Sequence, residues 1–130
     1  MEHKTDHFSF ILKPSTIKNA GVGVFALHDI AEGTHMALFS EGFQEEIRKS
    51  GDVPKELRGY CIIQKDGTLL CPKYFNKLDM GNYLNHSDTP NIKHTDKGYF
   101  SLRNIKAGEE IFADYRELEE PEDKRESFYK

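Results

Sequence analysis

Turn-forming residues interrupt this sequence so often that no uninterrupted apolar run exceeds four residues. Gly33, Gly51, Gly67 and Gly98 all lie in short polar stretches between these runs. Segments of this length suit β-strands, whereas a helix in a globular protein usually needs ten residues or more with a continuous apolar face. The spacing therefore predicts a mainly β domain of several small sheets with few short helices. It argues against a doubly wound fold, in which strands alternate with long amphipathic helices.

Individual elements follow from the local patterns. We expect strands over residues 8–12, 22–27, 36–40 and 111–113, hairpins over 61–71 and 92–103, and short helices over 43–49 and 122–129. Pro121 would be the first helical residue of the last segment, because a proline there loses no helical hydrogen bond. A length of 130 residues suits one domain with one core, so we treat 1–130 as a single domain with its core at about 8–115.

The two cysteines flank an Asp66-Gly67 pair, which is a strong signal for a two-residue hairpin turn. In that register Ile62 faces Cys71, and the thiol of Cys61 points to the opposite face of the hairpin. We therefore expect no disulfide. Two cysteines are also too few for a four-cysteine zinc site.

Charge and hydropathy restrict the kinds of partner and the cellular location that we expect for this chain. The 18 basic residues are scattered among 22 acids, and the net charge of −4 does not suit a nucleic-acid binder. No apolar run approaches the roughly 18 residues of a membrane span, and residues 1–7 lack the apolar core of a secretory signal, so we expect an intracellular protein. Acids gather at 41–46 and 117–126. They form either an ordinary solvated surface or a rim that attracts a basic partner.

Three segments carry residue types suited to a functional site. Residues 20–26 read Ala-Gly-Val-Gly-Val-Phe-Ala, in which two glycines allow close backbone approach or a positive φ. No helix or third glycine follows, so the segment does not fit a dinucleotide fingerprint. Residues 81–91 read Gly-Asn-Tyr-Leu-Asn-His-Ser-Asp-Thr-Pro-Asn and are dense in hydrogen-bonding groups. Residues 107–115 read Ala-Gly-Glu-Glu-Ile-Phe-Ala-Asp-Tyr, a turn that leads into a strand ending at a tyrosine.

In this order the three segments resemble the SET-domain family of protein lysine methyltransferases. The match covers residues 8–115 and includes the Gly-x-Gly motif, the Asn-His-Ser-x-x-Pro-Asn signature and the Gly-Glu-Glu-hydrophobic…Tyr motif. The resemblance implies a fold of small sheets whose C-terminal segment threads beneath a loop, a pseudoknot-like arrangement that brings Asn85 and His86 beside Tyr115. It also implies that the chain is an enzyme that transfers a methyl group from S-adenosylmethionine to a lysine of a protein substrate, which we expect to be basic.

The resemblance also assigns roles to individual residues. Tyr115 would be the catalytic residue, with its hydroxyl beside the transferring methyl group. The residues expected to contact the cofactor are Ala20, Gly21, Val22, Gly23, Tyr83, Asn85 and His86. His86 would act through its main chain and not as a general base. Phe39 and His94, with Tyr115, would border the channel for the substrate lysine.

The sequence departs from the family pattern at two places. Asp88 stands where relatives with a cysteine-rich module have a zinc-binding cysteine, and no cysteine follows Tyr115. We therefore expect no metal, and the segment 116–130 would be a short acidic tail that could be helical. The residue before Tyr83 is often basic in the family and is Asn82 here.

Two other functions remain as alternatives. A non-catalytic SET-like module would bind basic peptides through the acidic rim without methyl transfer. A metal enzyme could use His86, Asp88, His94 and Asp96 as ligands. However, Asp88-Thr89-Pro90 is typical of a turn, and alternating side chains on a strand need not converge.

Overall fold

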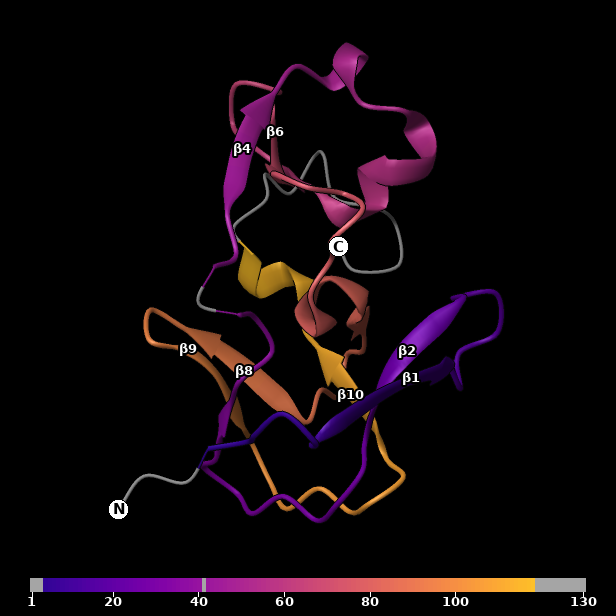
Figure 1. Cartoon of the computed structure of the whole chain (residues 1–130), viewed down its shortest axis with the longest axis vertical. Helices are drawn as coiled ribbons and strands as arrows, with labels where there is room; N and C mark the ends of the chain where they lie inside the picture. Colours follow the sequence, from indigo (N-terminus) through magenta and orange to yellow (C-terminus); the bar gives the residue numbers. More distant parts are fainter. Residues whose placement is uncertain (1–3, 41, 119–130) are drawn as a thin grey trace.

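The computed structural model describes residues 4–40 and 42–118, and ten short strands form three separate sheets within them (Figure 1). The first sheet has the order β1 (Phe10–Pro14), β2 (Val22–Ala26), β10 (Glu110–Ala113), β7 (Asn85–His86). The second has the order β3 (His35–Met36), β9 (Gly98–Ser101), β8 (Ile92–Thr95). The third has the order β4 (Glu45–Arg48), β6 (Leu69–Pro72), β5 (Ile62–Ile63).

Helical structure in the described part of the chain is limited to short 3₁₀ turns. They are η1 (Ser50–Asp52), η2 (Lys55–Tyr60), η3 (Met80–Tyr83) and η4 (Tyr115–Leu118). The expected fold class, mainly β with several small sheets and few short helices, is therefore confirmed. None of the helices in the described ranges is both long enough and apolar enough to cross a membrane.

The position of β10 brings segments that are far apart in the sequence side by side. This last strand lies between β2, to which it is antiparallel, and β7, to which it is parallel. Phe112 pairs with Asn85, and Ala113 pairs with His86. Parallel neighbours need a long connection, which the β8–β9 hairpin provides. The pairing brings the third sequence motif beside the second.

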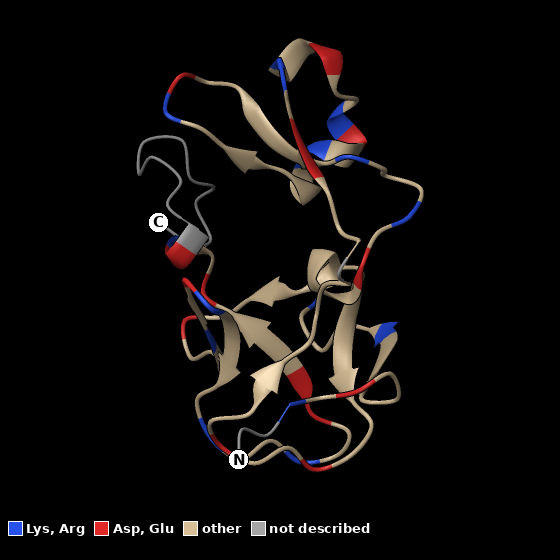
Figure 2. Cartoon of the chain, turned by 60° about the vertical axis from the view of Figure 1, so that its left-hand side comes forward, with Lys and Arg blue, Asp and Glu red and all other residues tan. Residues whose placement is uncertain are grey.

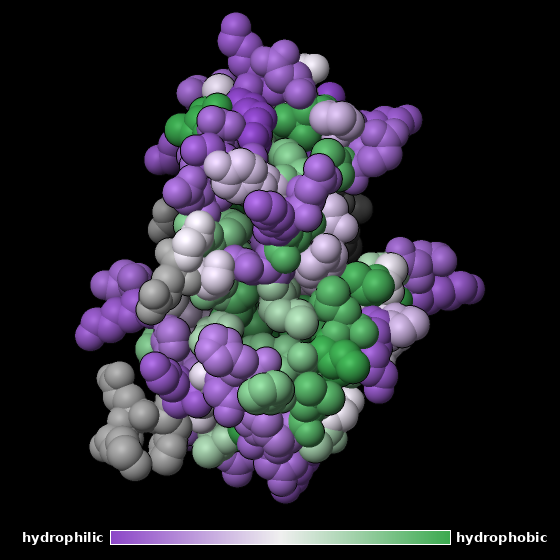
Figure 3. Space-filling view, viewed as in Figure 1, coloured by the Kyte–Doolittle hydropathy of each residue, from purple (hydrophilic) through white to green (hydrophobic). Residues whose placement is uncertain are grey.

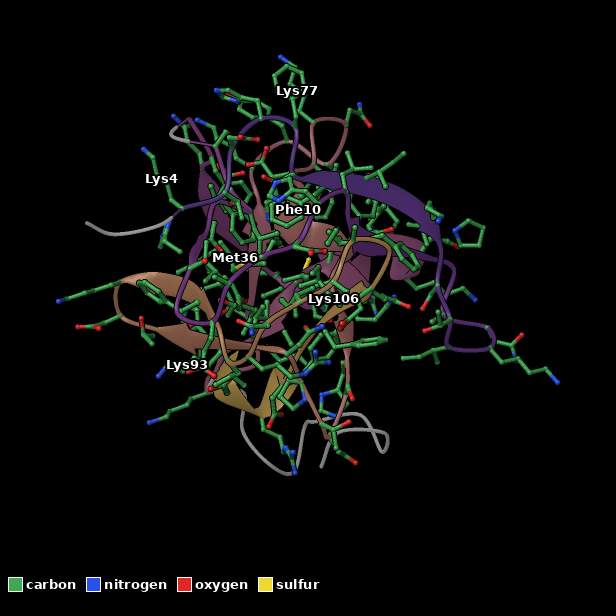
Figure 4. The ribbon with its side chains drawn as sticks, turned by 90° about the horizontal axis from the view of Figure 1, so that it is seen from below. Lys4, Phe10, Met36, Lys77, Lys93 and Lys106 are labelled. Atoms are coloured by element: carbon green, nitrogen blue, oxygen red, sulfur yellow. The ribbon has the colours of Figure 1, made fainter. Side chains whose placement is uncertain are left out.

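The main core lies beneath the first two sheets. It is formed by apolar side chains of the strands and of the segments between them, and its fully buried members include Val24, Met36, Ile92, Ile105 and Ile111. Seen from below, the buried Met36 and the half-buried Phe10 lie near the centre of the view, while the exposed Lys4, Lys77 and Lys93 lie nearer its edge (Figure 4). A second, smaller core of Val53, Leu69 and Cys71 supports the third sheet.

The expected helix over 43–49 is wrong. Residues 45–48 form β4, an edge strand whose Glu46 and Ile47 pair with Cys71 and Leu70 of β6. Glu-Glu-Ile-Arg has good helix-forming residues, but strand pairing in the tertiary structure overrides such local preference. The expected strand over 36–40 is limited to β3 at 35–36, and the expected helix over 122–129 lies outside the described residues.

The register of the 61–71 hairpin also differs from expectation by one residue. Ile62 pairs with Leu70, and Ile63 pairs with Leu69. Asp66 accepts hydrogen bonds from the Thr68 N–H (2.9 Å) and hydroxyl (2.6 Å), and Gly67 has a φ of +87°. The turn thus contains one more residue than the tightest hairpin, with glycine in the left-handed region.

This shift brings the two cysteines together. In the observed register Cys61 comes opposite Cys71, and both cysteines are free. The Cys61 thiol donates to the carbonyl of Leu57 (3.7 Å), and the Cys71 thiol donates to the carbonyl of Leu69 (3.6 Å). The expectation that they point to opposite faces is wrong, because it assumed the shorter turn. Burial, and then the neighbouring Cys71, raises the pKa of the Cys61 thiol to about 12.

The surface carries charged side chains of both signs as well as exposed apolar side chains. Lysine and arginine alternate with aspartate and glutamate along the chain and do not gather on one element (Figure 2). Apolar side chains reach the surface over β1 and β2 (Figure 3), where Ile11 and Val22 are 41% and 42% exposed.

Candidate active site

Tyr115 is held at both ends by the segment that contains β7. Its backbone N–H donates to Nδ1 of His86 (3.0 Å), and its phenol hydroxyl donates to the carbonyl of Leu84 (2.5 Å). The rings of His86 and Tyr115 lie 5.4 Å apart. The hydroxyl proton is thus donated to Leu84, which fixes the direction of the phenol. The Asn85–His86 pair and the late tyrosine, 29 residues away from His86, share one site.

Asn85 connects β7 to the glycine-containing segment. Its Nδ2 donates to the carbonyl of Val22 (3.0 Å) and to Oε2 of Glu110 (3.1 Å). Both amide protons are therefore used. Within the described residues no donor contacts Oδ1 of Asn85, which leaves an acceptor at the edge of the site.

Glu110 is a buried carboxylate that the sequence did not identify as functional. It is 5% exposed and accepts hydrogen bonds from the Ser15 hydroxyl (2.8 Å), the Thr16 N–H (2.7 Å) and the Thr16 hydroxyl (2.6 Å) as well as from Asn85. Burial raises the pKa of Glu110, but the hydrogen bonds from Thr16, Ser15 and Asn85 outweigh it and lower the pKa overall. No salt bridge pairs this carboxylate with a cation within residues 4–40 and 42–118.

The two glycines of the Gly-x-Gly motif have different roles. Gly21 has a φ of +73°, so it supplies a turn that other residues disfavour. Gly23 has no such φ, but a Cβ there would lie 2.1 Å from Oε2 of Glu110. It is buried directly against the carboxylate, while Ala20 and Val22 flank the turn. No sequence signal indicates the contact, because side chains alternate along a strand and Glu110 points away from the face of the core residue Ile111.

A large groove lies beside Tyr115. It has a volume of about 1030 Å³ and is lined by residues of the main body and of the segment that carries β4, β5 and β6. The expected channel residues Phe39, His94 and Tyr115 all line it, together with Tyr99. The Tyr99 ring is 4.9 Å from His94 and 6.4 Å from Phe39.

Tyr99 is a wall residue that sequence reasoning missed. Burial, and then the charges of Glu117 and Glu45, raises the pKa of its phenol to about 12. It therefore stays neutral at physiological pH. From the sequence, Tyr99 could be identified only as a residue of a hairpin strand. Its place in the groove depends on how that hairpin packs in the fold, where β9 pairs with β3.

Phe39 lies against a glycine. A Cβ at Gly81 would fall 2.2 Å from the Phe39 ring, so only glycine leaves room for this position of the ring. The Gly81 N–H donates to the carbonyl of Leu38 (2.9 Å), which joins η3 to the segment that carries Phe39. The ring also packs on Phe43, at 4.6 Å.

Tyr83 lies in η3 and packs against the main core and edge-on to Tyr60, with ring centroids 5.8 Å apart. Asn82, at the position often basic in the family, has a structural role here. Its side-chain carbonyl accepts from the N–H of Asp79 (3.0 Å) in a capping box.

The groove carries more negative than positive charge. Its lining contains Glu45, Asp96 and Glu117, and Arg58 is the only lysine or arginine in the same lining. Glu117 also accepts a hydrogen bond from the N–H of His94 (3.3 Å). The potential inside the groove therefore favours a cationic ligand.

The four residues of the alternative metal site do not form a cluster. His86 bonds to Asp88 (2.9 Å), whereas His94 and Asp96 line the groove from the β8–β9 hairpin. In the described ranges no three residues among His, Cys, Asp and Glu are arranged to hold a metal ion. Arg116 contacts Asp88 (3.5 Å) and Asp114 (2.8 Å), so an ion network occupies this corner.

Comparison with known proteins points to one family. The SET domain matches residues 21–116. No curated protein sequence matches the chain. Among solved structures, a candidate histone methyltransferase of Plasmodium falciparum is 21% identical, with a TM-score of 0.55 over 83% of this chain and 93% of that one.

Two further structures share the fold. The methyltransferase domain of human PR domain-containing protein 2 is 20% identical, with a TM-score of 0.54 over 82% of this chain and 76% of that one. A chain of ctPRC2, in an autoinhibited conformation bound to S-adenosylmethionine, is 22% identical with a TM-score of 0.54. That match covers 85% of this chain and 15% of the ctPRC2 chain.

Proposed function

The chain belongs to the SET-domain family, and on this premise we propose that it transfers a methyl group from S-adenosylmethionine to the ε-amine of a lysine in a protein substrate. One observation carries the proposal. The hydroxyl of Tyr115 donates to the carbonyl of Leu84, its backbone N–H donates to His86, and the same residue lines the open groove. A residue that reaches both the Asn-His motif and a groove can contact two reactants at once.

The residues around Asn85 fit a cationic cofactor. S-adenosylmethionine supplies the methyl group on a positively charged sulfonium and also carries an ammonium group. Both amide protons of Asn85 are donated to protein groups, so its Oδ1 is the atom that can accept a hydrogen bond from the cofactor. Behind it, Glu110 adds a buried negative charge without a cationic partner in the described part of the chain. We propose that Ala20, Gly21, Val22, Gly23, Tyr83, Asn85 and the main chain of His86 hold the cofactor.

On the groove side the protein must neutralise and orient a lysine. The pKa of a free lysine is near 10.4, so removing its proton at pH 7 costs about 4–5 kcal/mol. The aromatic walls of Phe39 and the neutral Tyr99 disfavour the charged amine by desolvation. Tyr115, which lines the groove, would orient the nitrogen of the incoming amine toward the methyl group. Orientation of the reactants then supplies much of the rate gain.

The charge of the groove supports a basic protein or peptide as substrate. Glu45, Asp96 and Glu117 attract a positively charged segment at long range, and the aromatic walls disfavour the charged form of its amine. We also propose that residues 8–115 form the catalytic core, because they contain the proposed catalytic, cofactor-binding and channel residues.

The test is incubation of the whole chain with methyl-labelled cofactor and a peptide array of basic, lysine-containing sequences, followed by mass spectrometry. We expect label on lysine ε-amines. Calorimetry should show cofactor binding in the micromolar range, typical of enzyme ligands, with competition by S-adenosylhomocysteine. Peptide binding without label would instead support the non-catalytic module, and absence of cofactor heat would refute the proposal.

A further inference from the structure

The side chain of His86 is buried inside the protein and points at the catalytic segment. It is 4% exposed, and each ring nitrogen has a partner. Nδ1 lies 3.0 Å from the backbone nitrogen of Tyr115, and Nε2 lies 2.9 Å from Oδ1 of Asp88. A second carboxylate, Asp114, is 3.7 Å from Nδ1 and is already bound by the guanidinium of Arg116.

These contacts determine where the imidazole proton resides. A backbone N–H can only donate, so Nδ1 of His86 must be the acceptor and carry no proton. The proton is therefore on Nε2, where it is donated to Asp88. Asp88 selects the tautomer that Tyr115 requires, in the same way that a carboxylate orients a histidine in other active sites.

The acceptor is needed because the parallel ladder ends just before the tyrosine. The last strand pair is Ala113 with His86, and the carbonyl of Ala113 accepts from the Ser87 N–H (3.0 Å). Beyond Ala113 the chain turns into η4, and within the described residues no strand carbonyl accepts from the Tyr115 N–H. Nδ1 of His86 takes the place of that carbonyl and so determines where the Tyr115 backbone lies.

We propose that the His86 side chain is a positioning residue for Tyr115, acting through Nδ1 in the tautomer held by Asp88. The proposal rests on the function proposed above. It differs from the role expected for the His86 main chain, because a substitution keeps the backbone and changes only the ring. The two ends of Tyr115 then have separate supports, Leu84 for the hydroxyl and His86 for the backbone.

Two substitutions separate the ring nitrogens. In His86→Asn the amide oxygen occupies the place of Nδ1, whereas in His86→Gln the amide reaches the place of Nε2. We expect His86→Asn to keep kcat within about threefold, and His86→Gln to lose roughly 10- to 100-fold, because only the former offers an acceptor to Tyr115. The dissociation constant for S-adenosylmethionine should change little in either variant.

A matched pair of controls is His28→Asn and His28→Gln, since His28 is exposed and bonds to Ser9 (2.8 Å) and to the carbonyl of Asp29 (2.9 Å), neither of which bonds to Tyr115. Both should have the wild-type kcat. Equal losses in the two His86 variants, with folding intact by circular dichroism, would show that the ring only fills space and would overturn the proposal.

Nuclear magnetic resonance keeps the test valid if a variant fails to fold. In the wild-type protein the ¹⁵N signals of His86 should show a proton on Nε2 and none on Nδ1. A proton on Nδ1 would contradict the proposal. If the wild type transfers no methyl group, the proposed function fails, whereas an active wild type with the wrong tautomer refutes the positioning role alone.

Discussion

Replacing Gly23 with alanine tests the contact between the Gly-x-Gly motif and Glu110. The new methyl carbon would lie 2.1 Å from Oε2 of Glu110 and 3.2 Å from Nδ2 of Asn85. Non-bonded atoms pack at about 3.5 Å, so the carboxylate must withdraw by roughly 1 Å or more. Its bonds to Ser15 (2.8 Å) and Asn85 (3.1 Å) would then exceed hydrogen-bonding distance.

The cost follows from the two lost bonds. A hydrogen bond to a charged group contributes about 1.5–3 kcal/mol, so Gly23→Ala should lower the free energy of unfolding by about 3–6 kcal/mol. That is a large share of the 5–15 kcal/mol of a typical domain. We expect a fall in Tm of roughly 10–20 °C for a chain of this size, measured by circular dichroism in thermal and urea unfolding.

The sign of the effect should reverse when Glu110 is removed. Gly23 is not in the left-handed region, so in a Glu110→Ala background the same alanine should be neutral or stabilise by up to about 1 kcal/mol by restricting the unfolded chain. Gly51→Ala, with no atom within 4 Å of the added carbon, is the matched control and should have little effect. A Gly23→Ala cost that persists without Glu110 would refute the reasoning.

Three further predictions concern single groups. Tyr115→Phe should remove most methyl transfer while costing only about 1 kcal/mol of stability, the value of the hydroxyl bond to Leu84; wild-type turnover in a radiometric assay would contradict its role. The Cys61 thiol, with a pKa raised to about 12, should react with iodoacetamide at pH 8 far more slowly when folded than in urea, and equal rates would count against its burial beside Cys71. Because the pKa of Glu110 is lowered on folding, its carboxylate should contribute stability fully above about pH 5 and lose it as pH falls through the folded pKa; Glu110→Gln should flatten urea-unfolding stability below pH 5, and an unchanged slope would exclude this contribution.

Much of the fold class follows from the sequence because it depends on local chemistry. Frequent turn residues and short apolar runs allow only short strands, and the three motifs in order indicated the family. The 92–103 hairpin and the strands at 22–27 and 111–113 were predicted within a few residues, since alternation and turn residues lie next to each other in the chain.

The wrong predictions share one cause. The local sequence allows more than one structure, and pairing with another segment of the chain determines which one forms. Residues 45–48 would suit a helix in isolation and become a strand because β6 offers free backbone groups. The 61–71 hairpin gained one turn residue, and this single shift brought Cys61 and Cys71 together. A register has a period of two, so one residue reverses every side chain.

The chemistry of the site depends on contacts between residues far apart in sequence. The sequence by itself determined which groups are present, namely the Gly-x-Gly turn, the Asn85-His86 pair and the late Tyr115. Only the tertiary structure decided that β10 lies between β2 and β7, that Glu110 fills the space above Gly23, and that the His86 ring supports Tyr115. Hydrogen bonds join atoms about 3 Å apart, and the order of residues along the chain does not indicate which distant residues come that close. Such partners are therefore identified only in the folded structure.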